Sequence, residues 1–159
     1  MTPPITPYTK FLGDRDAIAA IRDSIDRIAS LAHGWTADRF ERSYGPGKWS
    51  ARQILTHLAQ TELALGTRAR MAVVTPQYTA QDWDQDSWIG LDSRLEGPAA
   101  LAAFLATARM NLACFEGLSE VQRAIVLTHP EYGTITVDWI IHQMAGHHIN
   151  HLRQLERVA

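Results

Sequence analysis

The sequence has little of three things that mark specialised classes of protein: cysteine, net charge and long apolar runs. Its 159 residues include one cysteine, Cys114, so no disulfide can form within the chain and a reducing compartment is expected. The 15 basic and 17 acidic residues give a formal net charge of -2, which argues against a strongly basic nucleic-acid-binding protein. Residues 97–108 lack charge, but this run is too short to cross a bilayer, so we expect no membrane-spanning segment.

The beginning of the sequence, MTPPITPY, has neither a basic region nor an apolar run. We therefore expect no secretory signal, and the cytoplasm is the expected location. Hydrophobic residues make up 46% of the chain and charged residues 20%, which is ordinary for a globular protein. The length is that of one domain, so the sequence predicts a single domain over residues 1–159.

Apolar residues recur at spacings of three and four, which predicts four long helices and almost no strand. The first helix begins near Asp14 and ends near residues 33–34. The second begins after Ser50, where Gln53 completes a capping box, and runs over residues 51–73. The third covers 98–117 and the fourth 137–158. This pattern predicts an all-α four-helix bundle.

Two connections are less regular than the helices. Residues 75–97 form a long link that carries Trp83 and Trp88 among four aspartates. A link of this length is either a crossover strap pinned to the bundle by its tryptophans or a lid that contacts a substrate. Residues 125–136 form either a small hairpin or an irregular link.

The last helix carries the strongest chemical signal. His147 and His151 are four residues apart and so share one face of the helix, within an apolar stripe. Two imidazoles at this spacing can converge on one metal ion, or they can belong to a hydrogen-bonded core network. A third ligand would have to come from another helix, and His57 lies on the inner stripe of the second helix.

The remaining histidines are expected not to be ligands. His148 is rotated by about 100° from His147 on the helix and is assigned to the rim of the site or to a contact with another chain. His142 is expected to be solvated, and His129 and His33 lie in a link and at a helix end. Cys114 is predicted to be a structural thiol. No carboxylate is an evident general base, although Glu62 and Asp138 are candidates to orient an imidazole; both lie on the ligand-bearing helices.

Together, these motifs resemble the DinB-like superfamily, and most closely its YfiT-type branch of metal-dependent hydrolases and thiol transferases. The resemblance rests on GKWS at residues 47–50 followed by His57, and on Gly133, residues 138–139, residues 147–148 and His151. It implies a four-helix bundle with an unusual left-handed connection and frequent dimerisation. It also implies one divalent ion, here zinc or nickel, held by His57, His147 and His151.

A three-histidine site of this kind leaves the ion its full charge and at least one open position. A water there can act in hydrolysis, and a low-molecular-weight thiol can act in thiol transfer to a small electrophile. We favour thiol transfer because it needs no carboxylate base; hydrolysis and a non-catalytic metal-binding module are the alternatives. Five tryptophans in so small a domain, and the resemblance, predict a homodimer.

Overall fold

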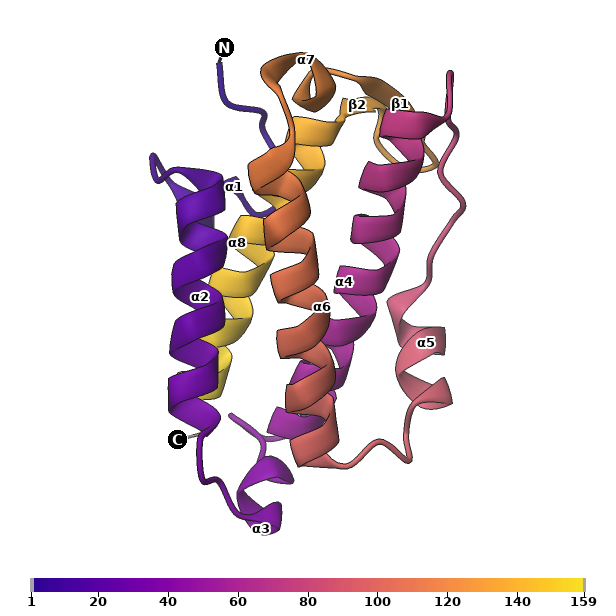
Figure 1. Ribbon diagram of the computed structural model, residues 1–159. Helices are drawn as coiled ribbons and strands as arrows, with labels where there is room; N and C mark the ends of the chain where they lie inside the picture. Colours follow the sequence, from indigo (N-terminus) through magenta and orange to yellow (C-terminus); the bar gives the residue numbers. More distant parts are fainter. Residues whose placement is uncertain (1, 159) are drawn as a thin grey trace.

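The computed structural model describes residues 2–158, and four long helices form a bundle in it (Figure 1). Met1 and Ala159, the ends of the predicted single domain, lie outside the described residues, so the domain boundaries stay a prediction. The predicted all-α four-helix bundle is confirmed. The long helices are α2 (Ala17–Ala32), α4 (Ala51–Val74), α6 (Gly97–Gly117) and α8 (Val137–Glu156).

Shorter elements connect the long helices. They are α1 (Thr9–Leu12), α3 (Ala37–Phe40), α5 (Gln85–Leu91), α7 (Glu120–Arg123), β1 (Val126–His129) and β2 (Gly133–Thr136). The one turn expected near residues 119–122 is therefore present as α7. The single turns α1 and α3 were not predicted, because four residues carry too little periodicity to be recognised.

The order of the bundle explains the long link between α4 and α6. Helices α2 and α4 occupy opposite corners, and each packs against both α6 and α8. Helices α4 and α6 are neighbours that run in the same direction (Figure 1), since the Arg52 side chain at the start of α4 reaches the Ser93 carbonyl just before α6. The link must therefore return along the whole bundle, which is a distance of about 30 Å for 20 helical residues.

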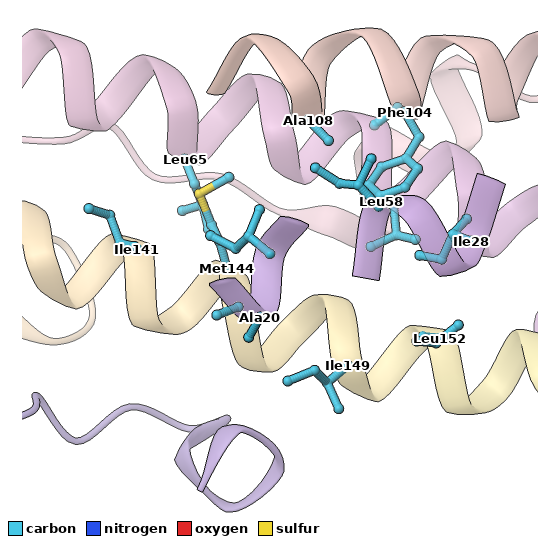
Figure 2. Packing of buried hydrophobic residues seen from close by; sticks show 14 of the residues in the cluster. Ala20, Ile28, Leu58, Leu65, Phe104, Ala108, Ile141, Met144, Ile149 and Leu152 are labelled. Atoms are coloured by element: carbon cyan, nitrogen blue, oxygen red, sulfur yellow. The ribbon is translucent and has the colours of Figure 1, made fainter. Parts of the chain in front are cut away.

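The core lies between the four helices, where apolar side chains from all of them meet (Figure 2). Leu58 and Leu65 of α4, Phe104 and Ala108 of α6, and Met144 of α8 are all buried. Close packing of this kind holds side chains in fixed positions. The same inner face of α4 continues through His57, so the core also positions the polar site.

Capping residues set where the functional helices begin. Ser50 accepts a hydrogen bond from Gln53 N, and the Gln53 side chain accepts one from Ser50 N, which confirms the predicted capping box. Thr136 caps α8 by accepting from Trp139 N. The predicted bounds of the long helices match the observed ones or differ by up to three residues, at helix ends where fraying and capping decide the last turn.

Residues 125–136, for which the sequence predicted either a small hairpin or an irregular link, contain a hairpin. Strands β1 and β2 pair antiparallel, with Val126 opposite Thr136 and His129 opposite Gly133. The long link adds to this hairpin, because Ala80 N donates to Thr128 O and Thr128 N donates to Tyr78 O. The link is therefore attached to the bundle at residues 78–80 and then forms α5.

Helix α6 differs from the sequence-based expectation in one respect. Within the described residues it is long and apolar enough to cross a membrane, with a mean hydropathy of 1.3 over its most apolar 18 residues. In the bundle, Phe104, Ala108 and Phe115 of this helix pack into the core. Only 28% of that apolar window is buried in the bundle, and one such helix is by itself weak evidence for a membrane protein.

Candidate metal centre

The three histidines singled out by the sequence lie together at the contact between α4 and α8. His57 Nε2 lies 2.9 Å from His147 Nε2, and His151 Nε2 lies 3.0 Å from the same atom. All three rings are buried, with exposed fractions of 2%, 4% and 5%. Helices α4 and α8 pack side by side, so a residue on the inner stripe of one faces an i, i+4 pair on the other.

Hydrogen bonds alone do not satisfy this cluster. A neutral imidazole has one donor and one acceptor nitrogen, and His147 Nε2 cannot pair fully with two other ring nitrogens. The Nδ1 atoms of His57 and His147 are buried and form no hydrogen bond within residues 2–158. Buried polar atoms of this kind are costly unless they are paired. One cation that accepts all three Nε2 lone pairs relieves the crowding, so the donor set fits a divalent metal.

Burial keeps the three rings neutral. It lowers the pKa of His57 to about 3, with a further contribution from the nearby His151. It also lowers the pKa of His151 to about 4 and that of His147 well below its ordinary value of 6.5. Neutral rings have free lone pairs at physiological pH, as a metal ligand requires.

Surrounding side chains fix the ring orientations. His151 Nδ1 donates to Gln154 Oε1 at 2.7 Å, which leaves its Nε2 lone pair directed at the cluster. The Trp49 ring packs on His57 with centroids 4.9 Å apart, and Trp83 stacks on the same imidazole. The Tyr8 ring meets His147 edge-on. The cluster is therefore a rigid one, with aromatic walls.

A cavity of about 590 Å³ opens beside the cluster, with His57 and His147 in its wall. Its volume is in the range of small-molecule sites. Trp83 and its neighbours in the long link form part of the lining. The link is therefore packed on the bundle through Trp83 and also borders the cavity, and its contact with a substrate stays a prediction.

The structure corrects the expectation for His148. Its side chain is fully buried, where a place at the rim or against another chain was expected. His148 Nε2 donates to Glu62 Oε1, and Asn111 Nδ2 donates to Glu62 Oε2 at 2.7 Å. Glu62 thus orients an imidazole, as the sequence allowed, but the imidazole is that of a non-ligand. A helical wheel places His148 correctly off the metal face but cannot show that α6 covers it.

His142 is also not solvated as expected, because its ring is mostly buried and its Nδ1 bonds the Asp138 carbonyl at 2.9 Å. Asp138 forms an ion pair with Arg123 and does not reach the three-histidine cluster. His33 is exposed at the end of α2. Cys114 is a free, half-buried thiol on α6, away from the cluster.

Sequence reasoning missed Arg68 and His129 as site residues. Both are buried, both line the cavity, and their side chains meet at 3.1 Å. The only signal for Arg68 was its position eleven residues after His57, three turns further along the same face of α4. His129 lies at the end of β1, and its position depends on a hairpin that the sequence did not establish.

Comparison with known proteins places this geometry in a family. The sequence model of the DinB superfamily matches residues 20–155 of this chain. Two proteins of Oceanobacillus iheyensis, both named as metal-dependent hydrolases by inference, are similar to the chain. One is 25% identical over 119 residues, covering 74% of this chain and 69% of the relative; the other is 22% identical over 132 residues, covering 82% and 76%.

Solved structures show the same fold. YfiT from Bacillus subtilis, an unusual four-helix bundle inferred to be a metal-dependent hydrolase, superimposes with a TM-score of 0.77 at 20% identity, over 99% of this chain and 91% of that one. A mycothiol-dependent maleylpyruvate isomerase superimposes with a TM-score of 0.73 at 14% identity over 94% of this chain. This chain spans 61% of that isomerase.

Proposed function

This chain belongs to the DinB superfamily, and we propose that it is a metal-dependent enzyme that transfers a low-molecular-weight thiol to a small electrophile. The observation that carries the proposal is the convergence of three buried, neutral Nε2 atoms, with His57 and His147 in the wall of a cavity. The three-histidine cluster and the names of the relatives support a divalent metal. Zinc and nickel are the proposed ions, since imidazole nitrogen suits both.

An enzyme fits this cluster better than a structural metal site does. Structural zinc sites have four protein ligands, often thiolates, whereas catalytic sites have three and an open position. Within residues 2–158, no fourth histidine, cysteine or carboxylate completes the group of His57, His147 and His151. His57 and His147 line the cavity, so a small molecule in it can reach the group.

Thiol transfer fits the side chains around the cluster. A divalent ion held there would lower the pKa of a coordinating thiol or water. The chain itself positions the reactants: His57, His147 and His151 hold the ion, and Trp83 and Tyr8 enclose the cavity. Glu62 is paired with His148. Within residues 2–158, the carboxylates that line the cavity, those of Asp82, Asp84 and Glu131, are exposed and do not join the three histidines, which favours a reaction that needs no carboxylate base. In the transfer, a carbon–sulfur bond forms, the bond from carbon to its leaving group breaks, and the thiol proton passes to solvent.

Hydrolysis is the second candidate, because the curated relatives carry that name. Its cavity and metal ligands would be the same, and the nucleophile would be water in place of a thiol. A non-catalytic metal-binding module is the outcome that remains if neither reaction is found.

The test is a parallel assay of the metal-loaded protein. One arm measures the conjugation of a panel of cellular thiols to a haloaromatic electrophile, and the other measures the hydrolysis of a nitrophenyl ester without thiol. We expect thiol-dependent turnover in the wild type that His151→Ala abolishes. His142→Ala is the matched control, because His142 lies on the same helix outside the cluster. Turnover that survives His151→Ala would contradict the proposal.

A further inference from the structure

Arg68 is a buried cation in the wall of the same cavity as His57 and His147. Its exposed fraction is 6%, and it forms no ion pair with a carboxylate within residues 2–158. One guanidinium nitrogen donates to Gln81 O at 2.6 Å, and the other faces His129 Nε2 at 3.1 Å. A buried charge is costly without a counter-charge, so its presence beside a cavity points to an anionic ligand.

His129 presents a second donor at the same point. Its Nδ1 accepts the backbone N–H groups of Glu131 and Tyr132, at 3.1 and 3.2 Å. Burial, and to a lesser extent Arg68, lowers the pKa of His129, so the ring is neutral near pH 7. A neutral imidazole with an accepting Nδ1 carries its proton on Nε2. Two donors, Arg68 Nη1 and His129 Nε2, thus face each other, and an oxyanion placed beside them accepts from both.

Asp82 attracts the Arg68 charge but forms no ion pair with it, and burial still lowers the pKa of Arg68. Asp82, Asp84 and Glu131 also line the cavity, but all three are exposed at its edge. The Asp84 carboxylate is bonded to the start of α5 through Asp86 N and the Ser87 hydroxyl. With Lys10, the lining carries two basic and three acidic side chains, so a divalent ion at the histidines makes the cavity positive overall.

The distance between the two ends sets the shape of the ligand. His57 and Arg68 are three turns apart on one face of α4, about 16 Å along the helix axis. Both side chains reach into the cavity, and the long arginine shortens the gap. A molecule that touches both ends is therefore extended, on the order of 10 Å between its reacting atom and its anionic group.

We propose that Arg68 and His129 bind the carboxylate of an extended small molecule whose reacting end lies at His57, His147 and His151. The role of the reacting end rests on the function proposed above; the carboxylate site does not. The carboxylate belongs either to the electrophile or to the thiol, and the guanidinium fork matches its two oxygens.

The binding test uses a matched series of ligands on the metal-loaded protein. Hydroxamates, which chelate metal ions, are prepared with chains of four to eight carbons that end in a carboxylate or in the neutral carboxamide. We expect the carboxylate to bind at least ten times more tightly than the carboxamide at one chain length in the wild type. Arg68→Gln should reduce that ratio to about one and leave the carboxamide affinity within twofold.

The controls separate carboxylate binding from a structural role of Arg68. Loss of the Arg68 bond to Gln81 alone would weaken both ligands equally, so only the ratio reports on the carboxylate. Lys10→Gln removes the same charge from the edge of the cavity and should preserve the ratio. A ratio of one in the wild type, or a ratio lost in Lys10→Gln and kept in Arg68→Gln, would overturn the proposal.

Two further measurements separate this proposal from the function on which it builds. If no hydroxamate binds, the open metal position is refuted, and hexanoate against hexanamide on the metal-free protein tests Arg68 alone. Equal binding of these two would refute the carboxylate site. In the transfer assay, 8-bromooctanoate against its amide, and 8-mercaptooctanoate against its amide, identify the reactant that bears the carboxylate. Arg68→Gln should raise KM for that reactant only.

Discussion

At the scale of single residues, metal binding depends on which histidine is replaced. His147 lies between the other two rings, within 2.9 and 3.0 Å of both, so its loss removes the centre of the cluster. We predict that His147→Ala loses at least 90% of bound metal, as measured by elemental analysis of the purified protein. His142→Ala should keep the wild-type stoichiometry, and an undiminished metal content in His147→Ala would refute the ligand assignment.

Acid should destabilise the metal-free protein through the same residues. The folded-state pKa of His57 is about 3 and that of His151 about 4, both below the ordinary 6.5. Between the folded-state pKa values and 6.5, the unfolded chain binds protons that the folded chain excludes. The stability present above pH 6.5 is therefore lost as pH falls. Each such histidine adds about 1.4 kcal/mol per pH unit to the slope of the unfolding free energy.

The measurement is urea unfolding of the metal-free protein between pH 7.5 and 4.5, beside His57→Gln. The variant removes one of these histidines but keeps the carboxylates that titrate in both proteins. The unfolding free energy of His57→Gln should therefore fall less steeply with pH than that of the wild type. Identical slopes would show that His57 is not held neutral in the folded state. Metal binding should weaken over the same range, because protons compete for the ring nitrogens.

Glu62 and His148 form a buried pair that stabilises the core without binding metal. Glu62→Met leaves His148 Nε2 without its acceptor and removes one of the two acceptors of Asn111 Nδ2, which keeps its bond to the backbone carbonyl of residue 62. Breaking a buried pair in this way costs about 3–5 kcal/mol. We predict a loss of that size in urea unfolding, with the metal content of the folded variant unchanged.

Glu41→Met is the control for Glu62, because Glu41 pairs with Arg52 at the surface. Exposed ion pairs contribute about 0–1 kcal/mol, so this variant should be close to the wild type in stability. A Glu62→Met protein that loses its metal while still folded would show that the pair is coupled to the three-histidine cluster.

At the scale of elements, Gly146 allows the N-terminal segment to lie directly on α8. A Cβ atom at this position would come within 2.5 Å of the Tyr8 carbonyl oxygen. Tyr8 in turn contacts the His147 ring, so a shift of this segment reaches the cluster. We predict that Gly146→Ala destabilises the protein by about 1–3 kcal/mol, although alanine is the better helix former.

Gly117→Ala is the control for Gly146→Ala, and we expect it not to destabilise the protein. Gly117 ends α6, and a Cβ atom there would meet nothing within 4 Å. This change should be neutral or stabilise the protein by up to about 1 kcal/mol. Thermal unfolding of both variants tests the prediction. Equal changes in stability would show that the close approach of Tyr8 to α8 does not contribute to it.

At the scale of the whole molecule, the homodimer stays a prediction, but the argument from tryptophan does not support it. Trp139 is buried and the other four tryptophans are partly buried against the chain itself, so none is left exposed for an interface. Apolar side chains are instead exposed along one stripe of α4, at Leu63, Met71 and Val74. We take this stripe as the surface to test for a contact between two copies of the chain.

Sedimentation at micromolar concentration tests the dimer. We expect a dimer in the wild type and a monomer in Leu63→Glu, because a charge in an apolar interface is left without a partner. Val121→Glu is the control, since Val121 is exposed on α7 and lies outside the stripe. A wild type that sediments as a monomer would contradict the prediction.

The sequence by itself determined the features that are local to one helix. The apolar spacing of residues 51–73 and 137–158 predicted α4 and α8, and the Ser50–Gln53 box predicted where α4 begins. The i, i+4 spacing put His147 and His151 on one face, because that spacing fixes neighbours within a helix whatever surrounds it. His57 was the candidate for the third ligand from its place on the inner stripe of the second helix, and the family resemblance implied the same set of three.

Only the tertiary structure decided which residues from distant segments meet. His148 is buried because α6 covers it and Glu62 pairs with it across 86 positions of the chain. Arg68 and His129 lie 61 positions apart and meet only because the hairpin and the long link are attached to each other beside α4. Such contacts depend on how whole helices pack, and the periodicity of one segment carries no information about the residues that another segment presents to it.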